Sequence, residues 1–273
     1  SRFEVPLVPE GDGSFRLEGG TQELALKMEE KVKDVRFNSA VQNLSRQEST
    51  GKIEVGVLDV LSGDEEILSA DAVFVALPPR LVVQDVNFQP KLPPNVVDAM
   101  GQTRTWMAQQ GKFAARYESR FWRSGKRVQR WYWKRCRQGG PLEILFENGN
   151  TIWAFLSNQS RWRSLSPVER KAAALKQLRE ELGNEEAERP LSTFEQDWSS
   201  EKWTCSEADS AEPHPWLHPD YSSVASVFRN SLWDGTLWFI GSETANPGVA
   251  GFLEGAVSAA SARTKQWAQI QAN

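Results

Sequence analysis

Residues 237–260 read LWFIGSETANPGVAGFLEGAVSAA, and this stretch decides how the rest of the chain is interpreted. Its first four residues are an apolar run typical of a short buried strand, and a helix is expected from about Val249 to Gln269. Small residues line the start of that helix, namely Gly251, Gly255, Ala256, Ala259 and Ala260. The open amides of a helix N-terminus suit an anionic or electron-rich group, and small side chains let a flat ligand or another backbone come close. A tightly packed C-terminal helix is the alternative interpretation.

The segments before this stretch predict an α+β fold. Alternating apolar residues predict strands over residues 35–38, 41–44 and 53–61, and an apolar run predicts a buried strand within residues 67–77. Aromatic-rich segments separated by turn residues predict an antiparallel sheet, with strands over residues 112–117, 128–136, 142–146 and 151–156.

Two further helices are expected from start and stop signals. Thr21 is a suitable N-cap after the Gly19-Gly20 turn, and Ser166 begins a capping box whose helix ends at Gly183. Residues 80–100 and 198–231 are rich in proline and are expected to be irregular.

The composition is that of a globular protein, with 40% apolar and 25% charged residues among 273. A net charge of −4 argues against overall attraction to nucleic acid or to an anionic membrane. Two cysteines, Cys136 and Cys205, cannot form a disulfide framework, so a reducing compartment, the cytoplasm, is predicted. Neither a membrane span nor an export signal is expected from the sequence. Twelve tryptophans predict aromatic pockets or exposed aromatic platforms.

Residues 237–260 strongly resemble the C-terminal flavin-binding motif of the monoamine oxidase family of FAD-dependent amine oxidases. Further segments are similar to family motifs in the same order, so that the resemblance covers almost the whole chain: residues 15–24, Val41, residues 70–79 and residues 112–122. The resemblance implies oxidation of an amine to an imine, with O₂ as acceptor and H₂O₂ as product.

The resemblance also implies roles for individual residues. Lys112 would be the catalytic residue beside flavin N5, and Val41 would flank the adenine. The remaining cofactor-binding residues would contact the ribityl, pyrophosphate and N1 regions of FAD, and they are Gly241, Ser242, Glu243, Gly251, Phe252 and Leu253.

Two departures from the family pattern affect the substrate and cofactor predictions. The pair of tyrosines that brackets the amine is missing: Phe252 stands at one position, and Trp198 or Trp203 could replace the other. Cys205 follows Trp198 too closely to match the cysteine that bonds flavin in the covalent members, so noncovalent FAD is expected.

A third departure is the absence of a strand, G-x-G-x-x-G and helix that would bind the ADP part of FAD. Residues 1–79 and 232–273 are therefore predicted to form a partial, Rossmann-like FAD-binding domain, and residues 80–231 a substrate-binding domain with a mixed or antiparallel sheet. The chain resembles the C-terminal half of an amine oxidase that does not retain FAD alone. Apolar faces at Leu77, the 237–240 strand and the last helix are expected to bind a missing N-terminal half or a second copy.

Other function classes remain as alternatives. The first is a non-catalytic, aromatic-rich ligand-binding or regulatory module derived from the same family. Basic residues interleaved with aromatics between Arg116 and Arg137 are also found in single-stranded nucleic acid binding, although a hairpin with one solvated face explains them better. His214 and His218 lack partners at metal-ligand spacing, so no metal site is predicted.

Overall fold

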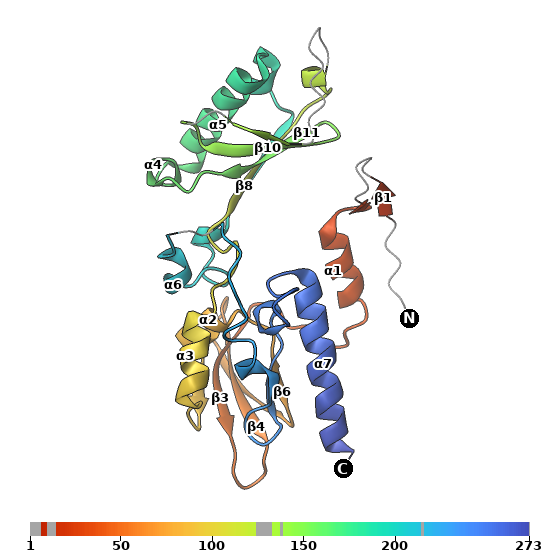
Figure 1. Ribbon diagram of the computed structural model, residues 1–273, viewed down its shortest axis with the longest axis vertical. Coiled ribbons are helices and arrows are strands. Elements are labelled where there is room, and N and C mark those ends of the chain that lie inside the picture. Colours follow the sequence, from red (N-terminus) through yellow and green to blue (C-terminus); the bar gives the residue numbers. More distant parts are fainter. Residues whose placement is uncertain (1–6, 10–14, 124–132, 137–138, 214–215, 273) are drawn as a thin grey trace. The chain divides into compact units, whose positions relative to one another are not determined.

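A computed structural model describes residues 7–9, 15–123, 133–136, 139–213 and 216–272 (Figure 1). The chain divides into two compact units, residues 1–42 with 56–68 and residues 43–55 with 69–273. Its helices and its parallel and antiparallel sheets confirm the predicted α+β class. The predicted division into flavin-binding and substrate-binding parts, with boundaries at residues 79/80 and 231/232, stays a prediction.

The glycine pair leads into a helix, as predicted. Strands β1 (Leu7–Pro9) and β2 (Phe15–Leu17) pair antiparallel, and helix α1 follows over Thr21–Glu29. The predicted N-cap is wrong, because Gly20 is the N-cap and Thr21 is the first helical residue. Gly20 has a φ of 88°, a left-handed value that glycine adopts at little steric cost.

A four-stranded sheet has the order β5-β4-β3-β7. Its strands are β3 (Ser39–Arg46), β4 (Ile53–Asp59), β5 (Glu65–Ala70) and β7 (Asn87–Gln89). The strand predicted over residues 35–38 is wrong, because these residues lie before β3, whereas the strand predicted over residues 41–44 is confirmed as part of β3. Strand β4 ends before Leu61 because the Asp59 carboxylate accepts hydrogen bonds from the amides of Leu61 and Ser62, at 2.8 and 3.0 Å, and closes a turn.

Residues 80–100, expected to be irregular, contain two helices, so that expectation is wrong. Helix α2 spans Pro79–Asp85 and helix α3 spans Pro94–Gln102, and each has a proline at its start. Proline is tolerated there because the first helical amides have no partner within the helix. The prolines therefore mark helix starts.

Residues 198–231 are also more ordered than the predicted loop. They include η3 (Trp198–Ser200), α6 (Glu207–Ser210) and η4 (Val227–Arg229). The buried Arg80 guanidinium of α2 lies 2.8 Å from Asp209 and 3.0 Å from Glu212, and Asp209 also accepts the Ser206 hydroxyl. Buried charges are stable only when paired, so this network fixes α6 against α2.

A five-stranded antiparallel sheet has the order β12-β8-β11-β10-β9, with helix α5 (Pro167–Leu182) along one face (Figure 1). The strands are β8 (Gly111–Arg116), β9 (Trp133–Arg135), β10 (Leu142–Asn148), β11 (Thr151–Leu156) and β12 (Ser192–Asp197). The predicted strands at 112–117, 142–146 and 151–156 are confirmed, while residues 128–132 of the fourth lie outside the described residues. The capping box between Ser166 and Glu169 is present, and α5 ends at Gly183 as predicted. The short elements η1 (Phe121–Arg123), α4 (Ser160–Arg163) and η2 (Glu185–Glu188) complete this region.

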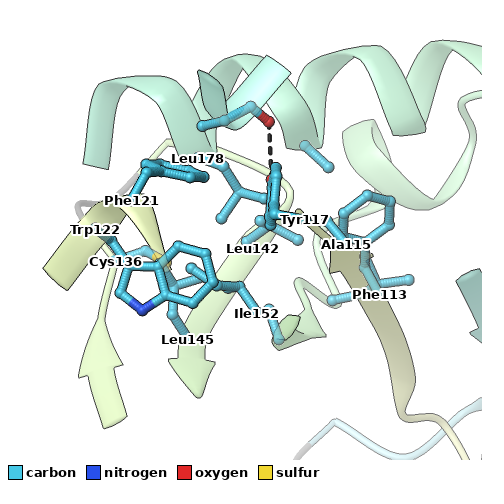
Figure 2. Packing of buried hydrophobic residues seen from close by; sticks show 14 residues of the cluster. Phe113, Ala115, Tyr117, Phe121, Trp122, Cys136, Leu142, Leu145, Ile152 and Leu178 are labelled. Carbon is cyan, nitrogen blue, oxygen red and sulfur yellow. Dashed lines mark hydrogen bonds between the residues drawn. The ribbon is translucent and has the colours of Figure 1, made fainter. Parts of the chain in front are cut away.

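Figure 2 shows the apolar core beneath α5. Alternate residues of the strands point into it, among them Phe113 and Ile152, and Leu178 of α5 packs against them. The Tyr117 hydroxyl donates a hydrogen bond to the Ala187 carbonyl at 2.8 Å. Because side chains alternate along a strand, residues such as Lys112 lie on the opposite, open face of the sheet.

Strand β12 is not predicted from the sequence. Its carboxylates lie on the helix-facing side of the sheet, where Glu195 pairs with Arg170 at 2.6 Å and Asp197 pairs with Arg163. These partners are distant in the chain, so the local pattern looks too polar for a strand.

The C-terminal region has the predicted strand, loop and helix. Strand β13 (Leu237–Phe239) pairs parallel with β6 (Val73–Val75), and η5 (Ser242–Thr244) and α7 (Leu253–Gln271) follow. All of β13 is buried, so the expectation of an exposed apolar face on it is wrong. Helix α7 begins at Leu253 instead of Val249, because the preceding residues form a turn.

Candidate functional site

The segment between β13 and α7 folds back so closely that two positions have no room for a side chain. A Cβ on Gly255 would lie 2.3 Å from the Val249 carbonyl oxygen, and one on Gly241 would lie 2.8 Å from that of Leu77. The group that comes close to Gly255 is the chain's own backbone. These glycines therefore fix the shape of the turn that leads into α7.

The N-terminus of α7 is open. Phe252 is its N-cap residue and forms no side-chain capping bond, while Leu253, the first helical residue, is 69% exposed. The first-turn amides of a 19-residue helix carry a partial positive charge. This end can receive an anionic or electron-rich group.

Glu243 is a buried carboxyl in η5. Burial raises its pKa, while hydrogen bonds from Ser242 and from its own amide act in the opposite direction. The Gly251 amide donates to the Ser242 carbonyl at 3.2 Å, which ties η5 to the start of α7. Residues Ser242, Glu243 and Gly251, separated by up to nine positions in sequence, are thus brought together.

Val41 lies in β3, half-buried, in the other compact unit. Its predicted contact with adenine stays a prediction.

Lys112 lies on the open face of the five-stranded sheet. Its Nζ atom is 5.4 Å from the ring centroid of Trp153 and 5.6 Å from that of Phe155, both on β11. Cation–π attraction at these distances holds the ammonium over the two rings. On the other side, Gln196 of β12 is in register with Lys112, and its amide donates to Glu201 at 3.0 Å. The ammonium is therefore positioned and also exposed.

Aromatic rings surround Lys112 on this open face. Phe146 stacks on Trp153 with centroids 4.1 Å apart, and Phe155 meets both rings edge-on. Phe194 of β12 is 62% exposed. The face offers an apolar surface with the Lys112 ammonium held above it, which suits a small, flat or apolar molecule.

A second aromatic group surrounds Phe252. The ring of His218 is stacked on it at 5.3 Å, Trp106 meets it edge-on at 4.9 Å, and Tyr221 meets His218 at 5.6 Å. Sequence reasoning missed Trp106 and His218 as neighbours of Phe252, since no local pattern connects three distant segments.

The predicted substrate tryptophans, Trp198 and Trp203, make no ring contact with Phe252 in the described part of the chain. Trp198 is 41% exposed and its amide donates to the Gln110 carbonyl, while Trp203 is 51% exposed beneath Lys202. Within the described residues, the ring contacts of Phe252 are with Trp106 and His218. A substrate role for Trp198 or Trp203 stays a prediction.

The cysteines are free and buried. Burial raises the pKa of Cys205 to about 11, so its thiol is protonated at neutral pH. No group of three potential metal ligands is found in the described part of the chain, and His214 lies outside it. None of the helices in that part combines the length and apolar character that crossing a membrane requires.

The basic and aromatic segment 116–137 lies partly outside the described residues. Three of its rings, those of Tyr117, Phe121 and Trp122, are buried in the core and cannot stack on nucleic acid bases. The Trp122 indole and Arg123 both donate to Glu147. These buried contacts argue against a nucleic-acid surface at these residues. The strands on either side of the segment, β8 and β9, are not neighbours in the sheet, so they do not form the predicted hairpin.

Comparisons with known proteins agree with the resemblance. The chain matches two structures of putrescine oxidase at 25% identity: a redesigned double mutant with a TM-score of 0.67, and the wild type bound to putrescine with a TM-score of 0.66. Each match covers 96% of this chain and 55% of the other. Cyclohexylamine oxidase from Brevibacterium oxydans IH-35A, at 21% identity and a TM-score of 0.60, shares the fold over 85% of this chain and 48% of its own.

The chain therefore spans about half the length of these solved relatives. A comparison with curated proteins found no match. The family profile described as flavin containing amine oxidoreductase matches residues 7–262, which is most of the chain. The chain belongs to the flavin-containing amine oxidoreductases.

Proposed function

We propose that this chain forms the substrate-binding part and the C-terminal flavin-binding part of an FAD-dependent amine oxidase. The amine loses two electrons and two protons to become an imine, and O₂ takes up these two electrons and two protons to become H₂O₂. The observation that carries the proposal is the close turn from β13 into α7, with Gly241 and Gly255 packed against backbone and the α7 N-terminus left open.

The flavin, when bound, would accept the electrons of the amine and return them to O₂. The residues present fit such a group. The amide at Leu253, with Gly251 and Phe252 beside it, would hold the N1 and C2 carbonyl side, where the helix dipole favours negative charge. Ser242 and Glu243 would contact the ribityl and pyrophosphate region. Binding would be noncovalent, which agrees with the buried, protonated thiol of Cys205.

Lys112 would act as the catalytic residue on the amine side. Its ammonium, held over Trp153 and Phe155, would orient a water molecule and stabilise negative charge that develops on oxygen. The aromatic rings beside it would exclude water from the amine.

The proposal includes a protein partner that covers exposed apolar surface at Leu77 and on α7. Leu77, Leu253 and Val257 are 44%, 69% and 58% exposed, and together they leave apolar surface beside a sheet of only two described strands, β6 and β13. Exposed apolar surface of this kind marks an interaction site. A dinucleotide-binding N-terminal half, or a second copy of this chain, would cover it in the cytoplasm.

A second candidate function is a non-catalytic ligand-binding or regulatory module of the same family, which the exposed aromatic face around Trp153 and Phe194 favours. Such a module would bind small molecules on its aromatic surfaces without retaining FAD.

Absorbance spectroscopy and rapid mixing test the proposal. The isolated chain should lack a flavin band between about 350 and 500 nm, whereas the chain joined to a dinucleotide-binding half should show one at one flavin per chain. In that loaded protein, Lys112→Met keeps the side-chain length and removes the charge. Flavin reoxidation by O₂ should slow by about tenfold to a thousandfold.

Lys202→Met is the matched control, since Lys202 also lies over a tryptophan, 4.3 Å from the Trp203 ring. Unchanged reoxidation in Lys112→Met, or no flavin binding with any dinucleotide-binding half, would refute the proposal and leave the non-catalytic module.

A further inference from the structure

One arginine joins the ends of three strands on the helix-facing side of the five-stranded sheet. Arg163 lies in α4, and its side chain is 14% exposed. Its Nε atom donates to the Ser157 carbonyl at 2.8 Å, and its Nη2 atom donates to the Gln109 carbonyl at 2.9 Å. Its Nη1 atom lies against the Asp197 carboxylate. Ser157 directly follows β11, Gln109 lies two residues before β8, and Asp197 is the last residue of β12.

The guanidinium also lies against the backbone of Gly111, the residue just before Lys112. A Cβ on Gly111 would lie 2.7 Å from Nη1 of Arg163 and 2.7 Å from the Leu156 side chain, so a larger residue would displace the guanidinium. Gly111 is in register with Asp197, the carboxylate that pairs with Arg163. The planar fork of an arginine can serve a carboxylate and two carbonyls at once. Arg163 therefore fixes the backbone from which Lys112 projects.

The carboxylate that receives Arg163 is kept ionised. Burial acts to raise the pKa of Asp197, but hydrogen bonds from Ser199 and Arg163 outweigh burial and hold that pKa below its ordinary value. Ser199 donates to the carboxylate from its amide at 3.1 Å and from its hydroxyl at 2.6 Å. The ion pair is therefore present at neutral pH and anchors the guanidinium.

The three strands joined by Arg163 are the strands that surround the Lys112 ammonium on the open face. Lys112 projects from β8, and Trp153 and Phe155, whose ring centroids lie 5.4 and 5.6 Å from its Nζ atom, belong to β11. Gln196, in register with Lys112, belongs to β12. Cation–π attraction extends to about 6 Å from a ring centroid, so a small shift of β8 against β11 would release the ammonium.

We infer that Arg163 is the positioning residue of Lys112, and that it acts from the opposite side of the sheet by locking β8, β11 and β12 beneath the ammonium. This inference rests on the proposed function, in which the Lys112 charge stabilises negative charge on oxygen. A misplacement of about 1 Å near reacting atoms can slow a reaction about a hundredfold. Loss of Arg163 should therefore reduce the effect of Lys112 although Lys112 itself is present.

Carbon-13 nuclear magnetic resonance tests the inference without flavin. Reductive methylation labels each lysine with ¹³C-methyl groups and keeps its charge, and the Lys112 signal is the one lost in Lys112→Met. Aromatic rings shield nuclei above their faces, so this signal should lie upfield of the signals of exposed lysines. In Arg163→Gln it should move to the position of those exposed lysines.

Arg163→Lys distinguishes positioning from stabilisation. It keeps a positive charge opposite Asp197 but lacks the fork that reaches the carbonyls of Gln109 and Ser157. Its urea midpoint should fall less than that of Arg163→Gln, whereas its Lys112 signal should move in the same way. A Lys112 signal that stays in place in both variants would overturn the inference.

Lys134→Gln is the matched control. Lys134 pairs with Glu181 at 2.6 Å on the same helix-facing side, but it belongs to β9 at the far edge of the sheet. Its loss should leave the Lys112 signal in place. An equal displacement of that signal in Lys134→Gln would show a general loosening of the sheet and would overturn the inference.

Rapid mixing of the flavin-loaded protein separates this inference from the proposed function. Arg163→Gln should slow flavin reoxidation by O₂ about tenfold to a hundredfold, and Lys134→Gln should leave it unchanged. If Lys112→Met slows reoxidation and Arg163→Gln does not, the inference fails and the proposed function stands. If Lys112→Met leaves reoxidation unchanged, the proposed function fails, and the carbon-13 signal still decides whether Arg163 places Lys112.

Discussion

Replacing Gly255 by alanine should destabilise the turn on which the candidate site is built. The added Cβ would lie 2.3 Å from the Val249 carbonyl oxygen and 3.1 Å from that of Ser242. Ordinary contact begins near 3.4 Å, so the backbone must move by 3.4 − 2.3 = 1.1 Å to relieve the first contact. Both contacts are to backbone atoms, and neither can be relieved by rotating a side chain.

The expected size follows from two opposing effects. Overpacking costs about 1–3 kcal/mol, and a contact of 2.3 Å to backbone belongs to the upper part of that range, about 2–3 kcal/mol. Alanine gains about 1 kcal/mol over glycine inside a helix, so the net loss should be about 1–2 kcal/mol. For a chain of this size, such a loss lowers the melting temperature by about 2–8 °C. Urea unfolding followed by circular dichroism measures the free energy of unfolding directly.

Gly248→Ala is the matched control, because a Cβ there would meet nothing within 4 Å. Its free energy of unfolding should stay within about 0.5 kcal/mol of the original value. A Gly255→Ala protein as stable as the original chain would refute the reasoning. In the flavin-loaded protein, the same substitution should weaken flavin binding more than Gly248→Ala does.

Two further predictions follow from buried ionisable groups. Burial raises the folded-state pKa of Glu243 above its unfolded value of about 4.3. The stability that protonated Glu243 contributes below about pH 4.3 is therefore lost as the pH rises through the folded-state pKa. Glu243→Gln does not ionise, so its stability relative to the original chain should be greater at pH 8 than at pH 4. Urea midpoints at both pH values check this, with the exposed Glu254→Gln as control, and a constant difference across pH would contradict it. Burial also raises the pKa of Cys136 to about 12 and that of Cys205 to about 11, so at pH 8 both thiols should react with a disulfide reagent only after urea is added. Rapid labelling of either thiol in the folded chain would show that its burial is wrong.

The elements that the sequence predicts well are those determined by neighbouring residues. The capping box at Ser166 and Glu169 defines the start of α5 within four residues of chain, and strand β11 begins directly after the turn at Gly149 and Asn150. Helices α2 and α3 were missed because the prolines at their first positions resemble chain breaks. Strand β12 was missed because Glu195 and Asp197 look solvated until Arg170 and Arg163 are placed beside them.

The candidate site also has one part that could be predicted from neighbouring residues and one part that could not. The turn from β13 to α7 could be predicted because its glycines, its strand and its helix are continuous in sequence. The aromatic group around Phe252 could not, since Trp106 reaches it from the segment before β8 and His218 from a proline-rich loop. Trp106 lies six residues before Lys112, so a single stretch of chain carries both a ring of the group around Phe252 and a cation of the open face. A shift of the backbone in that stretch would therefore move both groups together, and single substitutions at Trp106 and Lys112 are needed to separate their effects.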